Sequence, residues 1–223
     1  MAIFIDSSNV AEVEEITKWG IISGATTNPK IICQDGLSGG LEGTIKKIVD
    51  IVKGPVSVEV TEEDAAGMVE QAKEFAAWDP ENIVIKVPIG QEGLKVVNTL
   101  ENELGIKTNV TCMMSFNQAY LASLAGATYV SIFFGRIKDM GYDPREVIAD
   151  TREMIDREEL KAQIITGSIR HLMDVNEAFL AGAHIVTITP PILKKMTWNP
   201  RSETTIEEFN QIWRDMKKKG LLK

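Results

Sequence analysis

The stretch "NIVIKVPIG", residues 82–90, has the character of a buried strand and yet contains one lysine. The apolar, β-branched run "IVIKV" (83–87) is typical of a strand covered on both faces. Pro88 cannot donate to a sheet ladder, so the strand should end just after Lys86. A buried ammonium is costly unless it is paired, so the sequence predicts a partnered or chemically used lysine at the carboxyl edge of this strand.

Similar apolar runs recur along the whole chain and alternate with segments of helical period. We predict eight strands, at residues 3–6, 24–28, 56–60, 83–87, 108–114, 129–134, 163–167 and 185–189. Amphipathic segments, most of them closed by Gly, lie between these strands at 11–20, 64–78, 93–105, 116–127, 144–156 and 173–183. Eight βα units predict an α/β fold, a (β/α)8 TIM barrel that forms a single domain over residues 1–223.

A doubly wound open sheet is the competing architecture, and it would place a Gly-rich phosphate turn after the first strand. No G-x-G-x-x-G is present there, and in "DSSNVAEVEE" (6–15) we expect Asp6 or Ser7 to cap a helix. An additional C-terminal helix, at about 204–218, carries an apolar stripe made by Ile206, Phe209, Trp213 and Met216.

The composition excludes several classes of protein. With 44% hydrophobic and 25% charged residues the chain can bury a core, and a net charge of −8 argues against nucleic-acid and anionic-membrane partners. Neither a membrane span nor a signal peptide is visible, so we expect a cytoplasmic protein. Cys33 and Cys112 match no metal or disulfide spacing and are expected to be buried free thiols, and His171 and His184 form no ligand pattern. We therefore expect no metal site and no cofactor.

Polar residues recur at the predicted carboxyl edges of the strands, which form the active face of a barrel. Because side chains alternate along a strand, Lys86 points inward together with Val84, and Ser57 points inward together with Glu59. The same parity brings one set of polar groups to one mouth: Asp6, Asn28, Glu59, Lys86, Asn109, Thr111 and Ser131. Turn, cap or packing roles explain any one of these residues alone, but their convergence favours catalysis.

Arginines form a second candidate cluster. Arg136 follows the sixth strand, and "TGSIR" (166–170) brings Ser168 and Arg170 to the loop after the seventh. Loops in this part of a barrel are a usual phosphate site, and Arg binds phosphate oxygens in a bidentate manner. Surface salt bridges are the alternative explanation for both arginines.

A neutral amine at Lys86 would attack a ketone and form an iminium, an electron sink that weakens a neighbouring carbon–carbon bond. A carboxylate then has to accept a proton from the adjacent hydroxyl, and Asp6 is the candidate for this base.

These residues resemble the transaldolase family, in its small subfamily that also contains fructose-6-phosphate aldolases. The resemblance rests on "FIDSSN", "GATTNP", "VSVEV", "IVIKVP", "KTNVT", "SFNQA", "AGATYVS", "GR" and "GSIR", in this order from Ile3 to about Met196. It implies that Lys86 forms the Schiff base, that Asp6 transfers protons, and that Glu59 and Thr111 hold the catalytic water. It further implies a substrate-binding set that comprises Asn28, Asn109, Ser131, Phe133, Arg136, Ser168 and Arg170.

The subfamily's two activities differ at the positions of Glu59 and Phe133, where its aldolases resemble one another in carrying Gln and Tyr. The resemblance therefore implies a transaldolase of the pentose phosphate pathway, which moves a dihydroxyacetone unit from fructose 6-phosphate or sedoheptulose 7-phosphate to an aldose phosphate. The alternatives are a fructose-6-phosphate aldolase that releases free dihydroxyacetone, and a sugar-phosphate binding protein without turnover. The resemblance also implies a homo-oligomer, a pentamer or decamer, although "TWNPRSE" (197–203) departs from the "HPLTD" that many relatives have there.

Overall fold

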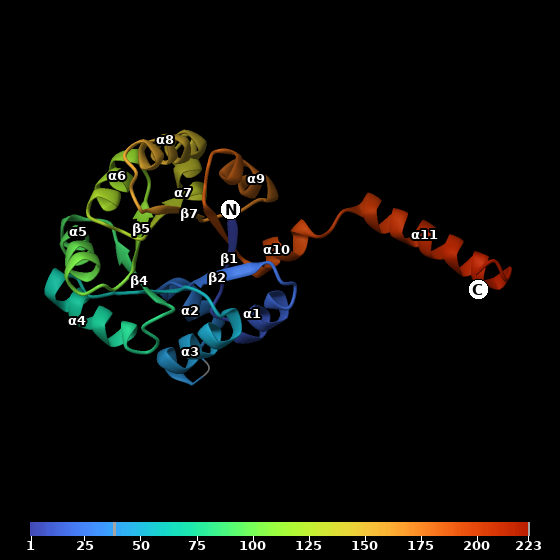
Figure 1. The fold of residues 1–223 in the computed structure, drawn as a ribbon, viewed down its shortest axis with the longest axis horizontal. Helices are drawn as coiled ribbons and strands as arrows, with labels where there is room; N and C mark the ends of the chain where they lie inside the picture. The colour runs from blue at the N-terminus through green and yellow to red at the C-terminus, as the bar shows by residue number, and fades with distance from the viewer. Residues whose placement is uncertain (38, 223) are drawn as a thin grey trace. The chain divides into compact units, whose positions relative to one another are not determined.

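A computed structural model describes residues 1–37 and 39–222 and contains a closed barrel of eight parallel strands in sequential order, as predicted (Figure 1). The strands are β1 (Ala2–Asp6), β2 (Ile22–Thr26), β3 (Val56–Glu59), β4 (Ile83–Pro88), β5 (Thr108–Met113), β6 (Tyr129–Phe133), β7 (Gln163–Gly167) and β8 (Ile185–Ile188). β1 pairs with β8, so this barrel leaves no open edge.

The connecting helices surround these strands (Figure 1). They are α1 (Val10–Thr17), α2 (Pro29–Asp35), α3 (Gly40–Val52), α4 (Ala65–Ala76), α5 (Gln91–Asn98), α6 (Phe116–Leu124), α7 (Phe134–Asp139), α8 (Pro144–Arg157) and α9 (Leu172–Leu180). α5 continues into a π-helical turn, η1 (Thr99–Glu103). The prediction of the six amphipathic segments is confirmed, but α2, α3 and α7 were not among the predicted helices.

The prediction that Asp6 or Ser7 caps the first helix is wrong. α1 begins after Asn9, whose side chain accepts hydrogen bonds from the N–H groups of Ala11 and Glu12. Asp6 is instead the last residue of β1, which leaves its carboxylate available at the mouth of the barrel.

The parallel register determines which polar residues become neighbours. Glu59 pairs with Lys86, and Lys86 in turn pairs with Asn109. On the two strands that precede β3, Asp6 pairs with Thr26. Side chains at the same height on adjacent parallel strands point to the same face, so these residues form one polar layer inside the barrel.

The chain divides into two compact units, Met1–Pro190 and a C-terminal unit that starts at Pro191. The second unit contains most of α10 (Pro190–Met196) and all of α11 (Pro200–Lys218). α11 starts at Pro200, not at about residue 204, because Asn199 caps its N-terminus and Pro200 suits the first helical position. Among the described residues, no helix combines the length and the apolar character that a membrane crossing requires.

Candidate active site

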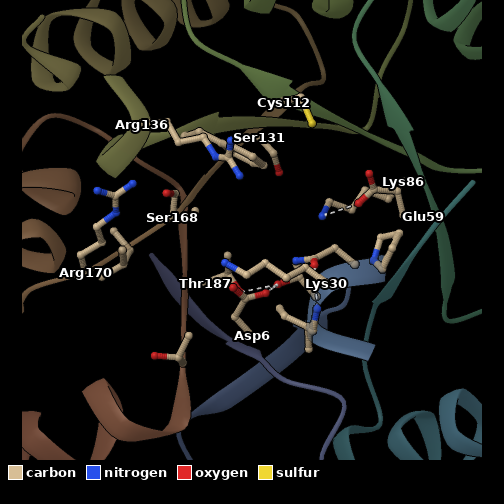
Figure 2. Close-up of a pocket in the computed structure, with 18 of the residues that line it drawn as sticks. Asp6, Lys30, Glu59, Lys86, Cys112, Ser131, Arg136, Ser168, Arg170 and Thr187 are labelled. Carbon is tan, nitrogen blue, oxygen red and sulfur yellow. Dashed lines mark hydrogen bonds and ion pairs between the residues drawn. The ribbon is translucent and has the colours of Figure 1, made fainter. Parts of the chain in front are cut away.

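One cavity of about 400 Å³ opens at the carboxyl ends of the strands (Figure 2). The sequence predicted that polar side chains meet at this mouth of the barrel, and most of the predicted site residues line the cavity. These are Asp6, Asn28, Glu59, Lys86, Ser131, Phe133, Arg136, Ser168 and Arg170.

Lys86 lies on the wall of this cavity with its ammonium satisfied on two sides. Nζ lies 2.9 Å from Oε2 of Glu59 and donates a 3.1 Å hydrogen bond to the carbonyl oxygen of Thr27. The side chains of Lys86 and Glu59 are only 6% and 14% exposed, so solvent screens this pair weakly. The lysine in the apolar strand is therefore partnered, and its carboxylate partner is positioned to accept its proton.

Asp6 supplies a second carboxylate on the same cavity. Thr26 donates a 2.7 Å hydrogen bond to Oδ1 of Asp6, and the Thr26 and Thr187 hydroxyl oxygens are 2.6 Å apart. Burial raises the pKa of the Asp6 carboxyl above its ordinary value, and the charge of Lys86 and the Thr26 hydrogen bond oppose this shift. A carboxyl group with a raised pKa is suited to exchanging protons with a substrate.

Asn109 and Thr111 are fully buried and do not belong to the residues that line the cavity. Asn109 donates to the Ser57 hydroxyl at 3.0 Å and accepts from the Ser131 hydroxyl at 2.7 Å. Ser131 thus links Asn109 to the cavity. The Thr111 hydroxyl has no hydrogen-bond partner in the part of the chain that the structure describes.

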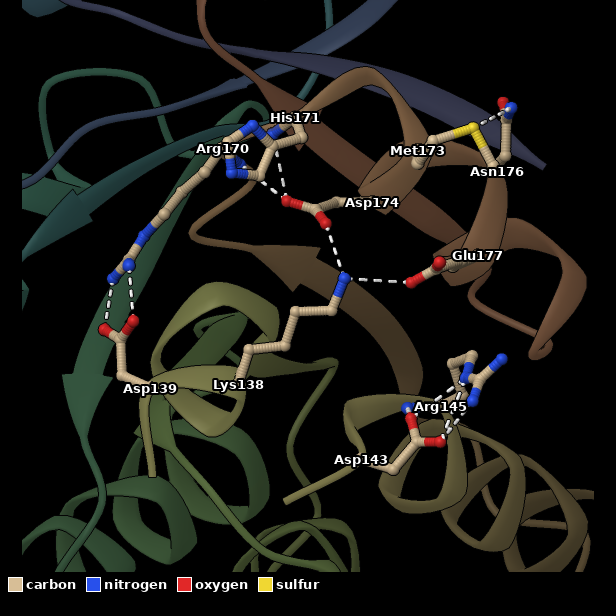
Figure 3. A network of polar contacts seen from close by, with 10 residues as sticks. All are labelled: Lys138, Asp139, Asp143, Arg145, Arg170, His171, Met173, Asp174, Asn176 and Glu177. Atoms are coloured by element: carbon tan, nitrogen blue, oxygen red, sulfur yellow. Dashed lines mark hydrogen bonds and ion pairs between the residues drawn. The ribbon is translucent and has the colours of Figure 1, made fainter. Parts of the chain in front are cut away.

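The three residues of the predicted phosphate cluster meet at one end of the cavity. The Arg136 guanidinium lies over the Phe133 ring, 5.7 Å from its centroid, and the Gly135 N–H donates to the carbonyl oxygen of Ser168 at 3.0 Å. Arg170 makes a bidentate salt bridge with Asp139 at 2.6 and 2.5 Å, so the surface salt bridge considered as an alternative exists for this arginine (Figure 3).

The loop that carries Ser168 and Arg170 is held by a buried carboxylate, Asp174 (Figure 3). Asp174 accepts hydrogen bonds from the backbone N–H groups of Arg170 and His171, at 3.0 and 2.9 Å, and from Lys138 at 2.8 Å. Burial raises the pKa of Asp174, but the hydrogen bonds from Lys138, Arg170 and His171 outweigh it and leave the pKa below its ordinary value. The loop is therefore fixed by a permanently charged anchor at neutral pH.

The expectation that both cysteines are buried is wrong: Cys33 and Cys112 are free but exposed. The register of β5 against β6 is irregular between Val110 and Met113, and Cys112 has φ +63°, so strict alternation fails at this point. Cys112 consequently lines the cavity (Figure 2). Burial and the charge of Glu59 raise the pKa of this thiol, with Lys86 opposing, which keeps it protonated and weakly nucleophilic.

Several cavity residues were not predicted from the sequence: Thr26, Lys30, Ile31, Gln34, Cys112 and Thr187. Thr26 and Thr187 follow the parity of their strands and were accessible to the same reasoning as Ser131. Lys30 and Gln34 belong to α2, and the Asn-Pro pair that starts this helix directly after β2 was its available signal.

The arrangement brings a lysine, two carboxylates and a pair of arginines to one cavity. Lys86 can act as a nucleophile once Glu59 has taken its proton, whereas the Cys112 thiol, with its raised pKa, is a weak nucleophile. Glu59 and Asp6 can exchange protons on separate parts of a bound molecule. The described residues contain no cluster of three metal-ligating side chains.

Comparisons with known proteins found matches over nearly the whole chain. The family described as Transaldolase/Fructose-6-phosphate aldolase matches residues 3–222. The chain is 44% identical over 218 residues to a "Probable transaldolase" of Streptococcus pyogenes serotype M5 (strain Manfredo), and the match covers 98% of this chain and 100% of the relative. Proteins of the same description from serotype M49 (strain NZ131) and serotype M1 match with the same identity and coverage.

Proposed function

Because the chain belongs to the transaldolase/fructose-6-phosphate aldolase family and is an enzyme of that family, we propose that it transfers a dihydroxyacetone unit between sugar phosphates through a Schiff base on Lys86. The donors are fructose 6-phosphate and sedoheptulose 7-phosphate, and the acceptor is an aldose phosphate. The observation that supports this most is the nearly buried Lys86–Glu59 pair, which shares its cavity with the Asp6 carboxylate.

In the proposed reaction Glu59 takes a proton from Lys86, and the free amine attacks the ketose carbonyl to form a carbinolamine. Loss of water gives the iminium, with Glu59 moving the protons and the unpartnered Thr111 hydroxyl able to hold a water. Asp6 then accepts the proton of the C4 hydroxyl while the C3–C4 bond breaks, and the bonding electrons pass into the iminium to give an enamine. The aldehyde product leaves, and attack of the enamine on the acceptor aldehyde reverses these steps.

The substrate-binding roles follow from position. Asn28 and Ser131 line the cavity and are proposed to bind substrate hydroxyls. The buried Asn109 orients Ser131 by accepting a hydrogen bond from its hydroxyl. Arg136, Ser168 and Arg170 are proposed to bind the phosphate, with the Phe133 ring supporting Arg136. Arg170 has to exchange Asp139 for the phosphate, or share it, when the substrate binds.

Transfer is favoured over free aldol cleavage because Glu59 and Phe133 occupy the positions at which this subfamily's aldolases resemble one another in carrying Gln and Tyr. We predict that the enzyme forms glyceraldehyde 3-phosphate from fructose 6-phosphate only when erythrose 4-phosphate is present. The combined Glu59→Gln and Phe133→Tyr substitutions are expected to increase acceptor-independent cleavage. Steady glyceraldehyde 3-phosphate release by the unchanged enzyme without acceptor would assign it to the aldolases instead.

The proposed assembly is a homo-oligomer, a pentamer or decamer, and the proposed location is the cytoplasm. The assembly is supported by the apolar stripe of α11, on which Ile206, Phe209 and Trp213 are 58%, 65% and 61% exposed. Large apolar side chains in such a row usually mark an interaction surface.

A further inference from the structure

We propose that Lys30 is an additional residue for recognition of the substrate's phosphate, acting across the mouth of the cavity from Arg136. This inference rests on the proposed function for the identity of the substrate. Lys30 belongs to neither cluster that the sequence indicated, and its role follows from its position and charge in the structure.

The sequence around α2 turns Lys30 toward the cavity. The Asn28 side chain accepts a 2.9 Å hydrogen bond from the N–H of Ile31, and Pro29 starts the helix, so Lys30 lies in its first turn. Gln34 follows one turn later on the same helical face, and both residues line the cavity. Figure 2 shows Lys30 on the side of the cavity where Asp6 and Thr187 lie, with Arg136 across from it.

The charge of Lys30 is poorly placed for helix stability. A cation in the first turn of a helix meets the positive end of the helix dipole. Within residues 1–37 and 39–222, no carboxylate lies within 4.0 Å of Lys30, whereas Lys46, Lys73 and Lys95 each pair with a glutamate of their own helix. A lysine that stabilises neither its helix nor a neighbouring acid is consistent with an anionic ligand.

The other cations of the cavity show which part of a ligand Lys30 would meet. Lys86 is neutralised by Glu59 and Arg170 by Asp139, while Arg136 has no acid partner among the described residues. Lys30 and Arg136 are therefore the two cavity cations that can bind an anion without giving up an acid partner, as Arg170 has to do. Lys30 follows β2 and Arg136 follows β6, and these strands lie opposite each other in a barrel of eight. A phosphate between them would have its oxygens contacted from both sides, which a single guanidinium cannot achieve.

The test compares Lys30→Met, which keeps an apolar stem without charge, with Lys30→Arg. Lys18→Met, which removes a side chain that is 70% exposed and paired with Glu14 on α1, is the matched control. Each variant is assayed at saturating fructose 6-phosphate with erythrose 4-phosphate or with unphosphorylated erythrose as acceptor. For Lys30→Met we expect the preference in kcat/KM for the phosphorylated acceptor to fall about tenfold, through KM, as loss of one charge-assisted hydrogen bond predicts.

Lys30→Arg should retain most of this preference, and Lys18→Met all of it. The inference is overturned if Lys30→Met leaves the preference unchanged, or if it lowers kcat/KM for both acceptors equally. Calorimetry of inorganic phosphate binding to the same variants tests the role of Lys30 independently of the proposed function. If fructose 6-phosphate forms no adduct with Lys86, the proposed function fails, yet weaker phosphate binding by Lys30→Met still supports the role of Lys30, and equal binding refutes it.

Discussion

The function of single residues in this protein depends on how the barrel satisfies charges that it buries. Lys86 lies in a strand that is otherwise apolar, and it is tolerated because Glu59 and the Thr27 carbonyl oxygen surround its ammonium. Removing one member of such a pair leaves a buried charge without compensation, which is more costly than the pair itself is stabilising. The residue that looks out of place in the sequence is therefore held at the site by its neighbours.

The raised pKa of Asp6 should make the rate of the proposed reaction depend on pH. Its pKa is raised, chiefly by burial, so it holds its proton to a higher pH than an ordinary Asp does. If Asp6 acts as the base in carbon–carbon cleavage, kcat/KM, which reports the free enzyme, falls as the pH decreases through this raised pKa. Thr26→Val removes a hydrogen bond that stabilises the charged carboxylate, so we predict that the acid limb of the kcat/KM–pH profile moves to higher pH.

Thr26→Ser is the matched control for this prediction, because it keeps the hydroxyl. Its acid limb should coincide with that of the unchanged enzyme. An acid limb that stays in place in Thr26→Val would show that Asp6 is not the group that it reports.

α7 packs closely against the loop between β7 and α9, and these two elements carry the three residues proposed to bind phosphate. Gly135 of α7 packs so closely that an added Cβ would lie 2.4 Å from the carbonyl oxygen of Ser168 and 2.8 Å from Nε of Arg170. Ser168 itself has φ +58°, an unusual conformation for a residue with a side chain. The glycine in "FFGR" thus allows close packing between α7 and the loop that carries Ser168 and Arg170.

We predict that Gly135→Ala lowers the free energy of unfolding by about 1–3 kcal/mol, as overpacking does, and raises KM for phosphorylated substrates. Chemical denaturation and steady-state kinetics measure the two effects. Gly90→Ala is the control, because the space around that position is open. Equal effects of the two substitutions would contradict the close-packing explanation.

Most of the elements could be predicted from the sequence, because strands buried on both faces appear as short apolar runs. Pro29, Pro88 and Pro190 also mark where three of these strands end. α3 was also identifiable, since Ile45, Ile48, Val49 and Val52 form a buried stripe at helical spacing. α2 and α7 have only seven and six residues, so tertiary contacts decide them more than periodicity does. Asp35, at the end of α2, accepts hydrogen bonds from the Ser7 and Ser8 hydroxyls, which local sequence does not reveal.

The site could be predicted to a similar extent. Strand parity correctly brought Asp6, Glu59, Lys86 and Ser131 together, because regular pleating determines their direction. It failed at Cys112, where the irregular β5 turns the side chain into the cavity. Lys30 was missed because parity describes strands and carries no information about a helix that follows one.

The C-terminal unit presents apolar side chains that association between copies of the chain could bury. α11 has no buried residue, and its exposed apolar residues include Phe209 and Trp213. We predict that the unchanged protein runs as an assembly of several copies in sedimentation or light scattering, and that Phe209→Glu combined with Trp213→Glu lowers its mass, because the charges prevent burial of the stripe.

Gln211→Glu adds a charge to the same helix on the side away from the stripe, and it should leave the mass unchanged. If the protein without substitutions has the mass of a single chain in solution, the proposed assembly is contradicted. Equal mass of the stripe variant and the unchanged protein would show that other surfaces hold the copies together.

The proposed mechanism requires Lys86 to become covalently attached to the ketose. Borohydride reduction of the enzyme in the presence of fructose 6-phosphate, followed by peptide mass mapping, tests it most directly, with Lys86→Met as the control. We predict an added dihydroxyacetone-derived, three-carbon unit on the peptide that contains Lys86, and none in the control. An enzyme that turns over but carries no such unit, or carries it on another lysine, would contradict the proposed Schiff base on Lys86.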